Sequence, residues 1–135
     1  MKQVLGGNKI EGQVVLTNGG IILSGGAGDD TFVFNTSLTN IDTIYDFNHS
    51  DDTINLDNSI FTSLVEGALS ADNLAFGTVA LDANDFLIYD KNSGNLSYDT
   101  DGNGGGASVV FANFANKPQD IDYTDFYAYS TSVTL

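Results

Sequence analysis

The sequence predicts an all-β domain built from short strands and tight turns, and three observations predict this class. Apolar residues recur nine positions apart, a period that suits a six-residue turn followed by a three-residue strand. These residues are Leu5, Val14, Leu23 and Phe32. The pair Asp-Thr stands directly before an apolar residue at 30–32, 42–44 and 52–54. Fifteen glycines against a single proline indicate many tight turns.

The first part of the chain, 1–58, is expected to hold the strands of this repeat, and its first two rungs are degenerate. Short β-type runs are expected at 32–34, 44–47 and 54–56, each after an Asp that closes a turn rich in Gly, Asn or Ser. The β-branched and aromatic residues of these runs disfavour a helix.

The second part, 59–135, is expected to continue the same domain. One short helix is allowed at 59–73, where four apolar residues roughly follow a helical period. These residues are Phe61, Leu64, Val65 and Leu69.

After residue 73 the pattern returns to strands. The runs 85–90 and 95–99 flank a Lys-Asn-Ser-Gly turn, which predicts a β-hairpin. A further strand is expected at 108–112, after a glycine-rich turn. The acidic and aromatic tail at 123–129 is expected as a strand that packs on these strands.

Charge restricts the partners of the domain. Eighteen acidic residues face four Lys or Arg, and the net charge is −14. Such a surface repels the phosphates of nucleic acid and anionic lipid, so cations are the expected partners. Asp outnumbers Glu eight to one, and the short Asp side chain can hold a hard cation close to a turn.

Other composition features exclude further classes of site. Cysteine is absent, which excludes disulfides and thiolate metal sites, and a single histidine is not expected to build a zinc cluster at all. The first residues lack a long apolar run, so no signal peptide is expected there, and no stretch approaches the roughly 20 apolar residues that span a membrane.

One nonapeptide carries the clearest chemistry. Residues 25–33, with the sequence GGAGDDTFV, fit the pattern G-G-x-G-x-D-x-U-x at every specified position. The glycines let the backbone adopt positive φ and turn carbonyl oxygens inward, and Asp30 adds a carboxylate. A neighbouring turn would supply the remaining oxygens of a calcium site. The alternative is a β-turn without an ion, in which the Asp caps its own backbone.

With its later Asp-Thr-apolar runs at 42–47 and 51–57, the chain resembles the C-terminal end of RTX (repeats-in-toxin, haemolysin-type calcium-binding) proteins over roughly 19–130. The resemblance implies a short right-handed parallel β-roll that continues into an antiparallel β cap. It also implies Ca²⁺-dependent folding and a secretion-signal-like tail read by a type I secretion machinery. The protein would then be secreted or on the surface of a bacterium, as part of a larger upstream RTX polypeptide.

The resemblance also implies a ligand set. Asp30 matches the sixth-position ligand, with backbone oxygens around Gly26 and Gly28. Because turns alternate sides on a β-roll, Asp30 and Asp52 are expected on one edge and Asp42 on the other. The acids that directly precede two of them are further candidates, namely Asp29 and Asp51. Only one repeat is complete, so one or two ions are expected.

A second acidic loop resembles half of an EF-hand. It carries three side chains at alternate positions: Asp99, Asp101 and Asn103. The twelfth position, where a bidentate Glu belongs, is Val110, and no helical pattern flanks the loop. A glycine-rich hairpin turn is favoured, and a weak cation site of another type stays open.

Catalysis is not expected. His49 is the only imidazole and is expected as a solvated loop residue, and the motif G-x-S-x-G is absent. The predicted function is therefore that of a non-enzymatic, calcium-folded domain that serves secretion and extracellular folding. Two alternatives stay open, a calcium-dependent module that binds polysaccharide through the tail aromatics, and a structural cap of a longer β-roll.

Overall fold

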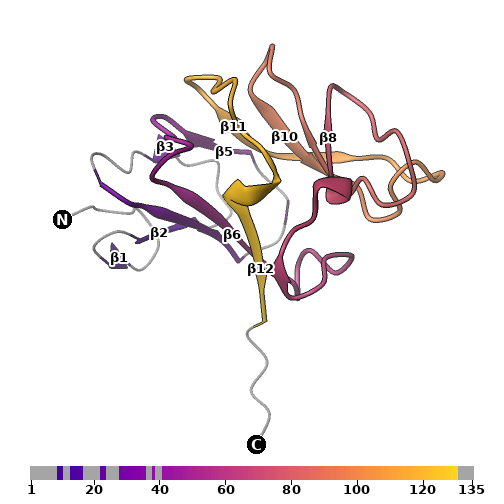
Figure 1. Ribbon diagram of the computed structural model, residues 1–135, viewed down its shortest axis with the longest axis horizontal. Coiled ribbons are helices and arrows are strands. Elements are labelled where there is room, and N and C mark those ends of the chain that lie inside the picture. Colours follow the sequence, from indigo (N-terminus) through magenta and orange to yellow (C-terminus); the bar gives the residue numbers. More distant parts are fainter. Residues whose placement is uncertain are drawn as a thin grey trace, which may run out of the picture.

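The computed structural model shows an all-β protein, as the sequence predicts (Figure 1). It describes residues 9–10, 13–16, 22–23, 28–35, 38 and 41–130. Within these ranges the elements are short strands and two 3-10 helices, and none of them is an α-helix.

The first sheet combines strands from both ends of the chain. Its order is β1-β2-β4-β6-β12-β7. The strands are β1 (Lys9–Ile10), β2 (Gln13–Leu16), β4 (Thr31–Phe34), β6 (Thr53–Asp57), β12 (Phe126–Tyr129) and β7 (Gly67–Ala68). Strands β2, β4, β6 and β12 run parallel, and their register aligns Val14, Phe32, Ile54 and Phe126 across the sheet.

The second sheet has the order β3-β5-β11-β10-β9-β8. The strands are β3 (Ile22–Leu23), β5 (Asp42–Ile44), β11 (Val109–Phe114), β10 (Asn95–Tyr98), β9 (Leu87–Tyr89) and β8 (Leu74–Phe76). Strands β9 and β10 pair antiparallel around the 91–94 turn, which confirms the predicted hairpin. Strand β11 confirms the strand expected after the glycine-rich turn.

The chain alternates between the two sheets from β2 to β6. Strands β2, β4 and β6 belong to the first sheet, while β3 and β5 belong to the second. The nine-residue spacing therefore has a structural counterpart, because Val14, Leu23 and Phe32 fall on successive strands of alternate sheets. Leu5, the first member of the series, lies outside the described residues.

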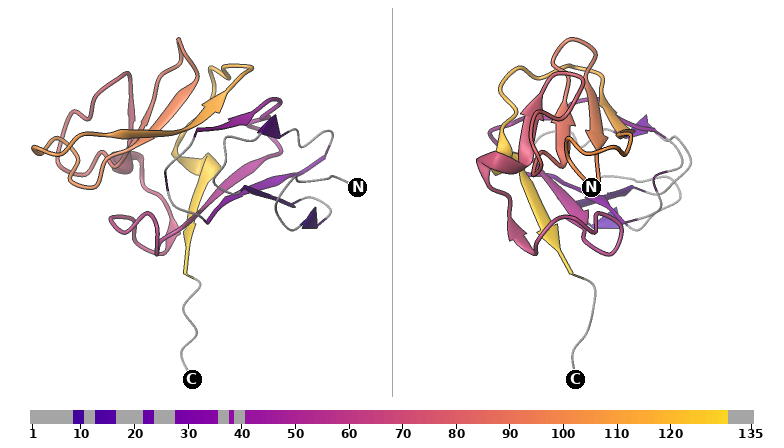
Figure 2. Two further views of the ribbon diagram at one scale, coloured as in Figure 1. Left: turned by 180° about the vertical axis from the view of Figure 1, so that it is seen from behind. Right: turned by 90° about the vertical axis from the view of Figure 1, so that its right-hand side faces the viewer.

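The second part of the chain agrees only in part with the expected antiparallel cap: the pairs β9–β10, β10–β11 and β7–β12 are antiparallel, but other pairs are not. Strand β11 pairs parallel with β5, and β8 pairs parallel with β9. The tail strand β12 pairs antiparallel with β7, which belongs to the part expected as the cap. It also pairs parallel with β6, and these two strands run side by side in Figure 2. Each sheet thus joins the two parts of the chain through a parallel pair of strands.

The helix allowed at 59–73 is wrong. The segment contains turns, β7 and the 3-10 helix η1 (Ala71–Asn73). Val65 is 84% exposed, so no helical apolar face forms, and Gly67 adopts a φ of 122°, which a helix cannot contain. The buried Phe61 and Leu64 anchor an irregular segment between the sheets.

Aromatic rings form one core between the sheets. Phe111 from β11 makes edge-to-face contacts with Phe34 from β4 and with Phe61, at centroid distances of 5.1 and 4.9 Å. Phe47 and Phe114 make a similar contact at 5.2 Å. Each such pair contributes about 0.5–1.5 kcal/mol beyond the burial of its area. The core therefore ties β4 and its neighbours to the later strands.

Candidate metal sites

Asp30 and Asp52 lie together at the starts of two neighbouring parallel strands, β4 and β6. The backbone N–H of Asp30 donates to Oδ1 of Asp52 at 3.0 Å, although the two residues are 22 positions apart. The backbone N–H of Thr53 donates to the Asp30 carbonyl at 2.9 Å. Both side chains are buried, with Asp30 1% and Asp52 4% exposed. The structure thus places on one edge the two acids that were expected there.

The environment of Asp52 disfavours its charge. Burial is the main cause that raises the pKa of Asp52, and the nearby charges of Asp30 and Asp46 raise it further. The backbone N–H groups of Asn48, at 2.8 Å, and Asp30 oppose this by donating to the carboxylate. A cation at this edge would neutralise the crowded carboxylates.

The other candidate ligands of the repeat are spread more widely. Gly28 is exposed with a φ of 90°, the backbone conformation for which the repeat uses glycine. Asp29 and Asp51 are exposed rather than buried beside Asp30. Asp42 is buried but begins β5 in the second sheet. Gly26 lies outside the described residues.

The second acidic loop connects β10 to β11, which pair antiparallel, so the hairpin interpretation is confirmed and the EF-hand is excluded. The N–H of Gly106 donates to Oδ2 of Asp101 at 2.9 Å. A Cβ on Gly104 would lie 2.5 Å from the same oxygen, so the glycines let the loop wrap closely around this carboxylate. The Gly106 bond lowers the pKa of Asp101, whereas burial and the hydrogen bond with Asp101 raise the pKa of Asp99.

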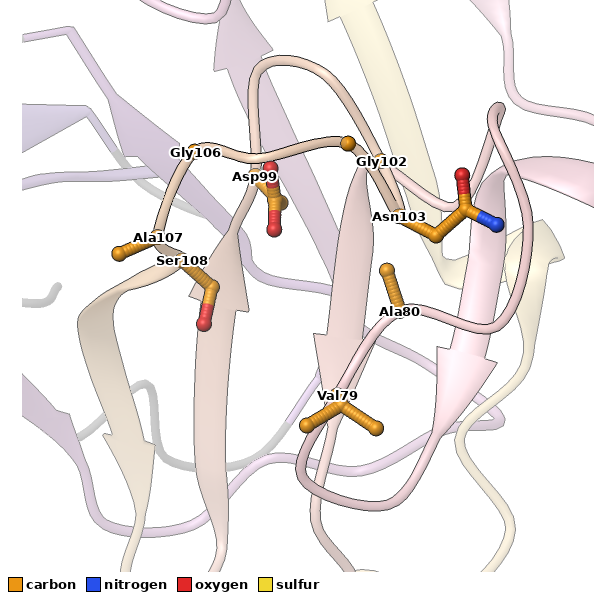
Figure 3. Close-up of a pocket in the computed structure, with 9 residues that line it drawn as sticks. Val79, Ala80, Asp99, Gly102, Asn103, Gly106, Ala107 and Ser108 are labelled. Atoms are coloured by element: carbon orange, nitrogen blue, oxygen red, sulfur yellow. The ribbon is translucent and has the colours of Figure 1, made fainter.

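A cavity of about 410 Å³ lies beside this loop (Figure 3). Polar side chains of Asp99, Asn103 and Ser108 line it together with the exposed Val79. The Asn103 amide donates to the Leu81 carbonyl at 3.3 Å, which joins the loop to the segment before β9. The cavity offers few charged oxygens, so it suits a weak cation site or a small polar ligand better than a tight calcium site.

His49 is the functional candidate that sequence reasoning missed. Its Nδ1 lies 2.8 and 2.9 Å from the two carboxylate oxygens of the buried Asp125. His49 lies in a turn and its side chain is 28% exposed, so the expected loop position is correct, but the contact with a buried carboxylate was not expected. The hydrogen bond to Asp125 raises the pKa of His49, while burial raises the pKa of Asp125 despite the imidazole. The two residues are 76 positions apart, and no local pattern signals their contact.

Two further buried acids are held by their own turns. Asp57 Oδ1 accepts from the N–H and the hydroxyl of Ser59 at 2.9 and 2.8 Å. Asp85 Oδ2 accepts from the N–H groups of Leu81 and Asp82 at 2.9 and 3.0 Å. These carboxylates close turns and need no ion to satisfy them.

No protein-family model, no curated protein and no solved structure matches the chain. Among the described residues, no helix is long and apolar enough to cross a membrane.

Proposed function

We propose that the chain is a calcium-binding domain of the RTX type, whose strands β2 to β6 form a short right-handed parallel β-roll. The single observation that carries the proposal is the contact between Asp30 and Asp52 at one edge of the first sheet. Both acids are buried, and both follow turns of the repeat that the sequence singles out. The alternation of β2 to β6 between two sheets supports the β-roll.

The chemistry of this edge fits a hard cation. Calcium takes six to eight oxygen ligands, which carboxylates and backbone carbonyls supply. Asp30 and Asp52 would supply carboxylate oxygens, and the turn that contains Gly28 would supply carbonyls. Burial is the main cause of the raised pKa of Asp52, and the Asp30 and Asp46 charges add to it; a bound Ca²⁺ would offset the repulsion from these charges.

Binding would couple calcium to folding. Without the ion, the carboxylates of Asp30, Asp46 and Asp52 repel one another, and the glycine-rich turns have a high backbone entropy. Extracellular modules bind calcium with dissociation constants of about 10⁻⁴ to 10⁻³ M. The domain would therefore stay unfolded at low internal calcium and fold outside the cell, after export by a type I machinery as part of a larger polypeptide.

A calcium titration of the purified chain tests this proposal, with circular dichroism and calorimetry as readouts. At a calcium concentration of 100 times the dissociation constant, one site adds about 2.7 kcal/mol to the free energy of unfolding. Asp30→Asn keeps the volume of the side chain and removes its charge, so the variant should lose most of this gain. Asp72→Asn removes an exposed charge in η1 and should keep it. Equal folding and equal stability of the wild type in chelator and in calcium would contradict the proposal.

A polysaccharide-binding module is a second candidate, favoured by two exposed aromatic rings. Tyr123 is 39% and Tyr127 is 43% exposed, at the η2 (Tyr123–Asp125) and β12 positions respectively. Exposed tyrosine faces can stack on sugar rings. Binding to a glycan array that requires calcium and is lost in Tyr127→Ala would support this function. Binding that survives the substitution would contradict it.

A further inference from the structure

Three side chains that the calcium proposal does not use converge at one point. They are His49, Asp122 and Asp125, and each offers a ligand atom within 4.8 Å of the other two. His49 Nδ1 lies 2.8 Å from Oδ2 of Asp125. A zinc site was not expected from the sequence, because the chain contains one histidine. The fold, however, places two carboxylates beside that imidazole.

Backbone N–H groups hold the side chains of Asp122 and Asp125, and the contact with Asp125 holds the imidazole of His49. Asp122 is the N-cap of η2, and its Oδ1 accepts from the N–H of Thr124 at 2.9 Å and from the Thr124 hydroxyl. The N–H of Asp122 donates to Oδ2 of Asp125 at 2.9 Å. His49 sits in the turn 48–51, where the N–H groups of Asp51 and Asp52 donate to the Asn48 carbonyl. The group therefore needs little ordering to receive an ion.

We propose that His49, Asp122 and Asp125 form a Zn²⁺ site, separate from the calcium edge. Zinc binds imidazole nitrogen and carboxylate oxygen, whereas calcium takes oxygen ligands. When His49 is protonated, Zn²⁺ would replace the proton on Nδ1, which leaves to water, and the imidazole would keep its Nε2 proton. Neutral His49 would bind as the tautomer that carries its proton on Nε2 and would release none. Ligand distances of about 2.0–2.2 Å in a tetrahedron place nitrogen and oxygen about 3.3 Å apart, so the pair opens only slightly. Water takes the fourth position.

The site would clamp the C-terminal strand onto the sheet. His49 belongs to the turn that leads into β6, and Asp122 and Asp125 belong to the segment that leads into β12. Strands β6 and β12 are parallel neighbours. Zinc would thus join the starts of two strands that lie far apart in sequence, and it would raise the stability of the folded chain.

The single histidine makes the test specific, because every imidazole signal belongs to His49. The untagged chain, saturated with Ca²⁺, is titrated with Zn²⁺, and the imidazole nitrogen resonances are followed by NMR. We expect the Nδ1 resonance to move to a metal-bound position and to saturate at one equivalent. If the imidazole resonances do not change, His49 and Asp125 form an ion pair only, and the proposal is overturned.

Two exposed or half-exposed acids provide a matched pair of variants. Asp122→Asn keeps an oxygen that can cap Thr124 but removes a charged ligand, so it should weaken zinc binding at least tenfold. Asp72→Asn removes an exposed charge in η1 that is not among the charges acting on His49, and it should leave the affinity unchanged. The calcium-dependent circular dichroism of each variant checks that it folds. Equal zinc affinity in the two variants would overturn the site even if zinc binds elsewhere on this acidic chain.

Discussion

Asp52, before β6, and Asp85, before β9, are buried to nearly the same degree, yet their surroundings differ. The carboxylate of Asp85 accepts two hydrogen bonds on Oδ2, and both come from N–H groups of its own turn, at Leu81 and Asp82. Asp52 accepts one bond from its own turn, at Asn48, and one from Asp30, 22 residues away. The Asp30 and Asp46 charges also face Asp52 and raise its pKa.

Burial of a carboxylate is therefore not in itself a sign of a metal site. The turn around Asp85 is complete without an ion, because its N–H groups satisfy the charge. The edge around Asp52 exists only when β4 and β6 are paired, and it gathers charge of one sign. A cation would stabilise the second arrangement and leave the first unaffected.

The regions around Asp52 and Asp85 are expected to share one hydrophobic core, and substitution of Phe111 tests this. It should have the largest effect on the free energy of unfolding among the predictions made for these regions. Phe111 contacts Phe34 from β4 and Phe61, so Phe111→Ala should lower the free energy of unfolding by about 3–5 kcal/mol. Denaturant unfolding in calcium, followed by circular dichroism, measures the change. Val109→Ala, on the same strand but exposed, should change it by less than about 0.5 kcal/mol. Two separate transitions in the wild type would show that the regions do not share a core.

Tyr89 lies in β9, the strand that follows Asp85. The titration of its hydroxyl measures how strongly burial disfavours a charged side chain in this region. Its hydroxyl donates to the Pro118 carbonyl at 2.9 Å, and burial is the main cause that raises its pKa to about 12. Because the folded state holds this proton more tightly, the stabilisation is complete below about pH 10 and is lost as the pH rises towards 12. About 2–3 kcal/mol should disappear over this window. Thermal unfolding between pH 9 and about 12 checks this, and a Tyr89→Phe variant with the same pH dependence would contradict it.

Asp85→Ala separates a turn-closing acid from a metal ligand. Loss of the contacts to the N–H groups of Leu81 and Asp82 should lower the free energy of unfolding by about 1–2 kcal/mol. The loss should be the same at a calcium concentration near the dissociation constant and at saturating calcium, since no ion is involved. Calorimetry under both conditions measures it, with Asp72→Ala as the exposed control. A loss that changes with the calcium concentration would assign Asp85 to a metal site.

The smallest effects are expected at the two exposed acids of the repeat turns. Asp29→Asn and Asp51→Asn should each change the stability by less than about 0.5 kcal/mol and leave the calcium midpoint unchanged. The same titration as for Asp30→Asn measures both. A calcium midpoint that rises tenfold in either variant would place that exposed acid among the ligands.

Sequence alone determined the parts that depend on neighbouring residues. The 91–94 turn predicts the hairpin of β9 and β10 because a glycine-containing turn between alternating runs specifies a local return of the chain. The nine-residue spacing places Val14 opposite Phe32, because equal rungs repeat their register. The alternation of the Asp-Thr runs on a β-roll predicts Asp30 and Asp52 on one edge, although 22 residues rather than two periods of nine separate them.

Only the tertiary structure decided the rest, because it depends on packing between distant segments. The apolar residues of 59–73 fit a helical period, yet the core takes Phe61 and Leu64 from an irregular segment. No pattern in the sequence around β12 predicts that this strand pairs with β6. The pairing brings Asp125 to His49, 76 residues away. Parallel pairing over long separations gains its energy from the whole core, so no short stretch of sequence encodes it.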